Sequence, residues 1–146
     1  MGLTFFSDLY MRLHEQAHVA SAHLYIHHII VPSIERLAIE EHVDSKHEIM
    51  NMIRRRERLR NHFNDVRFRK KISDMLNLPG VSFALTQFRV HLEASDEKIM
   101  NSVPWWMDRL KESNPILHNA IEGESGGRLW FGEVLVDLVT LLREYI

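Results

Sequence analysis

The chain has 146 residues, enough for one domain with a substantial core, and we expect a single helical domain over residues 1–146. The absence of cysteine excludes a disulfide framework, thiolate catalysis and cysteine-bound zinc, and no apolar run approaches the roughly 20 residues that span a bilayer. Because the N-terminus lacks the basic segment of a secretory signal, we expect a cytoplasmic protein.

The first predicted element is a helix over residues 5–40. Apolar residues recur there every three or four positions, which is typical of a helix and not of a strand. Ser7 and Thr4 are the candidate N-caps, because a short side-chain oxygen can accept from the free backbone N–H groups of the first turn. Pro32 lies inside the pattern, so we expect the helix to be kinked or restarted there.

Three further helices follow from the same periodicity. The second covers residues 43–77 and ends at a Pro-Gly pair. The third covers residues 82–121, with Ser82 as its N-cap and Pro104 at a kink or a first turn. The fourth, residues 128–146, is the most apolar and is predicted to be a core or interface helix.

The predicted fold class is all-α. We expect long, kinked, antiparallel helices that form a helical hairpin or a three-to-four-helix coiled-coil bundle. Three elements of more than 30 residues would make a rod about 45–50 Å long at 1.5 Å per residue. Because a thin rod buries its own apolar stripe poorly, pairing with a second copy is expected, which predicts a homodimer.

Positive charge is concentrated in residues 54–71. Nine of these residues are Arg or Lys and two are acidic, so the stretch carries a net charge of +7 and the rest of the chain −9. Such a run suits a polyanionic partner, either membrane phosphates or nucleic acid, although a solvated helix face is the simpler alternative. The charges fall between the apolar positions and are expected to point away from the core. The candidate phosphate contacts are Arg54, Arg55, Arg58, Arg69 and Lys70. Arg56 and Arg60 are instead candidates for neutralisation by Glu57, Asp65 or an acidic neighbouring helix.

Two histidine and aromatic motifs have competing interpretations. His14 to His18 match the H-E-x-x-H zinc motif, but the motif lies in the first predicted helix, without the sheet that holds substrate in zinc proteases. No glycine-rich phosphate loop is present either, so we expect no catalytic residues, no metal and no cofactor.

Trp105 and Trp106 adjoin Pro104, and we expect one buried and one exposed ring at a helix start.

The second predicted helix carries a recognisable series of residues. An apolar residue and a proline precede it in Ile30-Val-Pro-Ser-Ile-Glu-Arg-Leu. A basic run then leads into a segment that contains Leu59, Phe63, Asp65 and Arg67. The order is similar to a known pattern in which a basic run is followed by K-L-x-D-Y-D-x-x-R. In this chain the D-Y-D part of the pattern is not intact.

The third and fourth predicted helices continue the similarity, with Val103-Pro104 followed by Arg109 and then an apolar helix from Leu129. Together these stretches resemble the BAR domain family of amphiphysin, endophilin and yeast Rvs proteins. The resemblance covers about two thirds of the chain, which is shorter than ordinary BAR domains. The resemblance implies an antiparallel coiled-coil homodimer that binds anionic membranes and senses or shapes their curvature.

The sequence therefore predicts a non-enzymatic protein that is cytoplasmic and peripheral to the membrane, with an anionic phospholipid surface as its partner. The alternative is a helical interaction or scaffold protein that binds a partner protein through its apolar helix faces, especially Leu129 to Ile146. Nucleic-acid binding is the less favoured third interpretation, because no helix-turn-helix or zinc module accompanies the basic run.

Overall fold

A computed structural model describes residues 2–37, 48–78 and 85–145. Over those ranges the chain forms helices and no strand, which confirms the all-α class. The elements are α1 (Gly2–Tyr25), the π-helical turn η1 (Ile26–Ile30), α2 (Val31–Glu35), α4 (Glu48–Phe63), α5 (Val66–Leu76), α6 (Thr86–Glu93), α7 (Asp96–Asn101), α8 (Val103–Ser113), α9 (Pro115–Glu122) and α10 (Gly127–Tyr145).

The first predicted helix is one continuous path with a restart at its proline. The turn η1 separates α1 from α2, and Pro32 lies in the first turn of α2. A wider π turn before a proline relieves the clash between its ring and the carbonyl four residues earlier. Thr4 and Ser7 lie inside α1 and do not cap its start. The expected end at residue 40 and the expected cap Ser82 lie outside the described residues.

The second predicted helix is divided in two. Asp65 has an extended backbone, and its carboxylate accepts a hydrogen bond of 2.8 Å from the N–H of Arg67, which caps α5. Arg69 reaches back to α4, where its Nε donates to the carbonyl of Phe63 at 2.9 Å. A free carbonyl at the end of one helix and a free N–H at the start of the next are both satisfied, so the break is a stable junction.

The third predicted helix is divided into α6, α7, α8 and α9. The Ser95 hydroxyl accepts from the N–H of Lys98 at 3.2 Å, and the Asn114 side chain accepts from the N–H of Leu117 at 3.1 Å. Pro104 lies in the first turn of α8, as expected. Because of these breaks, the three expected elements of more than 30 residues are divided into shorter helices, of which the longest in the described chain is the 24-residue α1.

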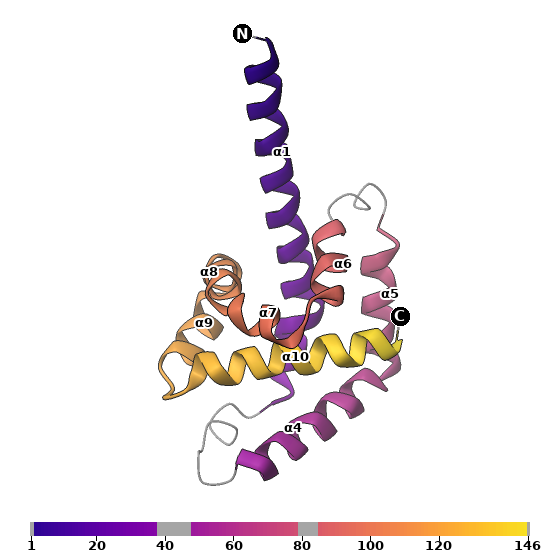
Figure 1. Cartoon of the computed structure of the whole chain (residues 1–146). Coiled ribbons are helices and arrows are strands. Elements are labelled where there is room, and N and C mark those ends of the chain that lie inside the picture. Colours follow the sequence, from indigo (N-terminus) through magenta and orange to yellow (C-terminus); the bar gives the residue numbers. More distant parts are fainter. Residues whose placement is uncertain (1, 38–47, 79–84, 146) are drawn as a thin grey trace.

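The helix α10 lies at the centre of the core and crosses the body of the molecule (Figure 1). It contacts α4, α6, α7, α8 and α9. The side chains that it buries are Trp130, Phe131, Val134, Leu135, Leu138, Val139, Leu141 and Leu142. Gly132 allows a close approach of α7, because a Cβ there would lie 2.8 Å from the Sδ of Met100. Of the two roles predicted for the last helix, α10 therefore has the core role.

The N-terminal half of α1 projects away from the other helices (Figure 1). Its C-terminal half packs against α6 and α8, where Ala22 and Tyr25 are buried. In the projecting half, the side chains that the structure describes between positions 8 and 16 are all exposed, namely Asp8, Leu9, Met11, Arg12, Glu15 and Gln16. The body of the protein therefore leaves this part of α1 uncovered.

Candidate functional site

The basic run of residues 54–71 lies on α4 and α5. Seven of its nine basic side chains are exposed, and we call these seven the basic surface: Arg54, Arg56, Arg60, Arg67, Arg69, Lys70 and Lys71. Of the five candidate phosphate contacts, the structure places Arg54, Arg69 and Lys70 on this surface. Arg58 is partly buried and engaged in a contact of its own. The remaining candidate, Arg55, is buried.

Arg55 forms a buried ion pair with α10. Its Nε donates to Oδ2 of Asp137 at 2.8 Å and its Nη1 donates to Oε2 of Glu133 at 3.1 Å. The Arg55 and Asp137 side chains are 3% and 5% exposed. The expectation that Arg55 points away from the core is therefore wrong. The reason is helical spacing, because Arg55 lies one turn from Asn51 and from Leu59, which are both buried against the rest of the chain.

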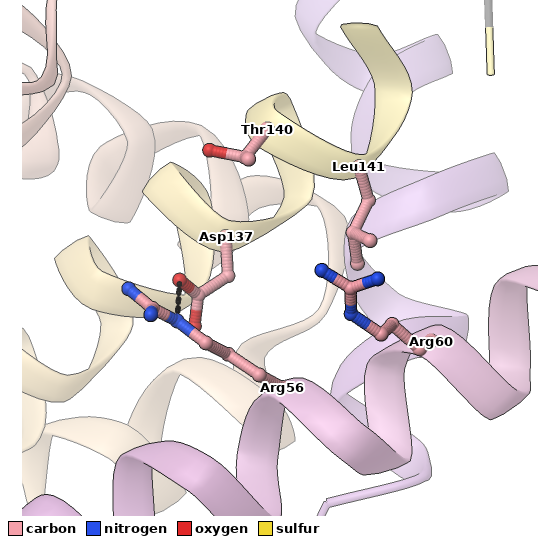
Figure 2. A pocket seen from close by; sticks show the side chains of 5 residues that line it. All are labelled: Arg56, Arg60, Asp137, Thr140 and Leu141. Atoms are coloured by element: carbon pink, nitrogen blue, oxygen red, sulfur yellow. Dashed lines mark hydrogen bonds and ion pairs between the residues drawn. The ribbon is translucent and has the colours of Figure 1, made fainter. Parts of the chain in front are cut away.

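Arg56 shares the same carboxylate from the solvent side. Its Nε donates to Oδ1 of Asp137 at 3.2 Å, so the expectation that an acidic neighbouring helix neutralises this residue is confirmed. Arg60 has no ion pair with any described residue. Figure 2 shows the side chains of Arg56 and Arg60 reaching from α4 toward α10, where Thr140 and Leu141 lie.

Two adjoining cavities separate α4 from the C-terminal half of α10, and they share Arg60 and Leu141. We call them together the α4–α10 groove. The first, of about 150 Å³, is lined by Arg56, Arg60, Asp137, Thr140 and Leu141 (Figure 2). The second, of about 470 Å³, is lined by Arg60, Phe63, Asn64, Arg69, Leu141, Glu144 and Tyr145.

Arg69 is held in position at the groove by three contacts. Arg69 bonds the Phe63 carbonyl and donates from Nη2 to Oδ1 of Asn64 at 3.2 Å, and its guanidinium lies 5.6 Å from the ring centroid of Tyr145. Guanidinium groups present paired N–H donors that match the oxygens of phosphate or carboxylate groups. Because the charge of Asp137 is shared by Arg55 and Arg56, positive charge is in excess along the groove.

An exposed apolar patch lies beside these cations at the start of α4. Ile49, Met50 and Ile53 are 71%, 49% and 49% exposed. Ile49, Ile53, Arg56 and Arg60 follow one another at helical spacing, so they form one stripe along α4, of which the arginine end borders the α4–α10 groove. Ile49 and Ile53 belong to the apolar positions of the second predicted helix, which were expected to face the core. The structure corrects this, because the face with Arg55 turns inward and the isoleucines turn outward.

Two other motifs from the sequence, the H-E-x-x-H stretch and the tryptophan pair, lie outside the basic surface. The side chain of His14 lies outside the described residues, and among the residues described no cluster of three His, Asp or Glu side chains could hold a metal ion. Trp106 is buried and Trp105 exposed, which confirms the expectation for this pair.

Within the described ranges, no helix combines the length and the apolar character that are needed to cross a bilayer. We compared the chain with known protein families, with curated proteins and with solved structures. None of these comparisons finds a match.

Proposed function

We propose that this protein binds anionic membrane surfaces peripherally, through the basic surface of α4 and α5, and that it does so as a homodimer. The observation that carries the proposal is the combination of seven exposed cations with the exposed patch of Ile49, Met50 and Ile53. Cations pair with lipid phosphates, and apolar side chains beside them enter the interface between headgroups and acyl chains.

The expected strength of this contact comes from many small terms. Each basic residue close to an anionic bilayer contributes on the order of 1 kcal/mol. Two copies of the surface in one dimer engage the same membrane together, so the second contact forms at a high effective concentration. The resemblance to BAR domains adds the expectation that vesicle diameter influences binding.

The proposed dimer rests on the projecting half of α1. A lone helix of about 15 residues is marginal in water, because nucleation is costly and few contacts compensate for it. Leu9 and Met11 are exposed there on opposite sides of the helix, and pairing with the same helix of a second copy would cover at least one of them. Light scattering at micromolar concentration should therefore report a dimer.

Leu9→Glu with Met11→Glu should shift the protein toward monomer. Leu129→Glu is the matched control, because Leu129 is also an exposed apolar residue but lies on α10 in the body of the fold. A wild-type monomer, or a double variant that stays fully dimeric, would exclude pairing through α1.

The membrane proposal is tested by sedimentation with vesicles. The charge-reversed variant combines Arg54→Glu, Lys70→Glu and Lys71→Glu, three exposed positions of the basic surface. Arg55 is left unchanged, because a glutamate there would face Asp137 and Glu133 in a buried site. The matched control reverses the exposed residues Arg89, Lys98 and Lys111, which gives the same net charge on other helices and leaves the projecting half of α1 unchanged.

Wild type and control should bind vesicles that contain anionic lipid and ignore neutral ones. The charge-reversed variant should bind at least about a hundredfold more weakly, since three attractive terms of about 1 kcal/mol become repulsive. Binding should weaken as salt shortens the Debye length from about 30 Å at 0.01 M to about 8 Å at 0.15 M. If wild type ignores anionic vesicles at low salt, the membrane proposal is wrong.

The second candidate function is binding of a partner protein. This binding was expected on the apolar residues of the last helix, but most of these residues on α10 are buried in the core of the protein. The observation that favours this function is the exposure of Leu9 and Met11 on the projecting half of α1. A gel shift with duplex DNA and RNA, run beside the vesicle experiment, tests the nucleic-acid alternative on the same charge-reversed variant.

A further inference from the structure

A cavity of about 340 Å³ lies on a different part of the molecule, between α1, α6, α7 and α8. We call it the tryptophan cavity. Its apolar wall consists of Ala22, Val90, Ala94, Ile99, Trp105 and Trp106. None of these residues belongs to the basic surface or to the α4–α10 groove. A concave apolar site of a few hundred Å³ with a few polar groups is the usual form of a small-molecule site.

His91 is the most deeply buried of the polar side chains that line this cavity, the others being His18, Lys98 and Ser102. It is 7% exposed, and its Nε2 has no hydrogen-bond partner in the described chain. Its ring lies between aromatic neighbours, with centroids 5.3 Å from Tyr25 and 4.9 Å from Trp106. Burial, with the nearby charge of Arg143, lowers the pKa of His91 to about 4. The imidazole is therefore neutral at pH 7, and a buried polar atom without a partner is costly unless a ligand or a water satisfies it.

Positive charge surrounds the cavity. Lys98 lines it, is exposed, and forms no ion pair with the described residues. Arg143 lies behind the wall, where it donates to the carbonyls of Leu92 and Ala94, each at 2.6 Å. Arg109 stacks on Trp105, with its guanidinium carbon 5.5 Å from the ring centroid, and its charge is paired with Glu112 at 3.5 Å. An anion at the mouth of the cavity would therefore meet chiefly the Lys98 ammonium and the field of Arg143.

We propose that the tryptophan cavity binds a small monocarboxylate with a flat aromatic body. The body would stack against Trp105 and Trp106, since aromatic pairs prefer offset or edge-to-face contact. The carboxylate would lie at Lys98. This assignment is independent of the proposed membrane function, because it uses other helices and no residue of the basic surface.

The test is an NMR titration of the full chain with 2-naphthoate as the probe. The indole N–H signals of Trp105 and Trp106 report the site, and that of Trp130, which is buried on α10, is the internal control. We expect a saturable shift at Trp105 and Trp106 with a Kd of about 1 mM or tighter, as expected for a ligand of about 13 heavy atoms. The Trp130 signal should stay unchanged.

The matched neutral probe, 2-naphthylmethanol, isolates the role of the charge. It should bind the wild type about three- to fivefold more weakly than 2-naphthoate, the effect of one partly exposed ion pair. Lys98→Met should remove that difference and leave the affinity for the alcohol unchanged. Lys98 is exposed, so circular dichroism should confirm an unchanged fold in this variant.

Trp105→Ala removes part of the apolar wall and should weaken both probes at least tenfold, whereas Leu129→Ala on α10 should affect neither. The proposal is overturned by the absence of a saturable shift up to about 10 mM, a limit set by the weakest affinity expected for a ligand of this size. Equal affinity of wild type for both probes, or full binding to Trp105→Ala, would also overturn it.

Discussion

The inner and outer faces of α4 carry similar residue types in opposite environments. On the inner face, Asn51 and Arg55 are buried, and on the outer face Ile49 and Ile53 are exposed beside Arg54. Arg54 and Arg55 are neighbours in the chain, yet one belongs to the basic surface and the other is part of the core. The comparison shows that the partner across the interface, and not the polarity of a side chain, decides which face of this helix is buried.

The partner is the carboxylate of Asp137. Burying two charges costs several kcal/mol per ion, and close geometry offsets that cost only when both partners are present. Arg55 and Arg56 both donate to Asp137, and Glu133 receives a further bond from Arg55. The contact between α4 and α10 therefore depends on one carboxylate, whereas each cation of the outer face acts almost alone.

Removal of that carboxylate should have the largest effect. Asp137→Leu leaves the Arg55 guanidinium buried with only the half-exposed Glu133 beside it. The free energy of unfolding should fall by about 3–5 kcal/mol, as for other buried pairs that lose one partner. Denaturant unfolding with a circular dichroism signal measures this loss.

The double variant Arg55→Met with Asp137→Leu should regain most of the stability, because no buried charge remains. An unchanged stability of Asp137→Leu alone would show that Arg55 does not depend on this pair.

Acid should have an intermediate effect, through two buried histidines. His62 lies on the inner face of α4, stacks on Phe68 with a centroid distance of 3.7 Å, and has no hydrogen-bond partner on either ring nitrogen among the described residues. Burial, with a smaller effect of Arg36, lowers the pKa of His62 to about 4, and His91 is lowered to the same value.

Because an unfolded histidine has a pKa of about 6.5, protonation favours the unfolded chain. The contribution of the two neutral histidines to the free energy of unfolding should be fully present above pH 6.5. It should be lost as the pH falls toward 4, by on the order of 2 kcal/mol for each histidine. Urea midpoints at pH 7 and pH 5 measure the change. His62→Phe should flatten the dependence and His27→Gln, at an exposed position, should not. A dependence that is unchanged in His62→Phe would exclude this role of His62.

A single charge reversal on the outer face should have the smallest effect. Arg54→Glu should change the free energy of unfolding by no more than about 0.5 kcal/mol, as is usual for exposed positions without an ion pair. Arg55→Glu, one residue along, should unfold the protein far more easily, because it places three carboxylates around one buried site. Similar stabilities for the two variants, measured by the same denaturant unfolding, would remove the distinction between the two faces.

The sequence by itself determined the all-α class, the concentration of positive charge in residues 54–71 and the restart at Pro32. The sequence also contains capping signals, which hydrophobic periodicity does not detect. Asp65, Ser95 and Asn114 are typical N-caps, and each begins a new helix inside an expected rod. Capping is local, since an oxygen bonds an N–H two or three residues away, so these breaks were predictable from the chain alone.

Only the tertiary structure decided the rotation of α4 and the composition of the two candidate sites. Asp137 lies 82 residues from Arg55, and no local pattern connects them. The tryptophan cavity likewise joins α1 to α6, α7 and α8. The rotation of a helix about its axis is set by the summed contacts of the face that it buries. When that face includes an arginine whose partner carboxylate is distant in sequence, hydrophobic periodicity alone assigns the wrong face to the core.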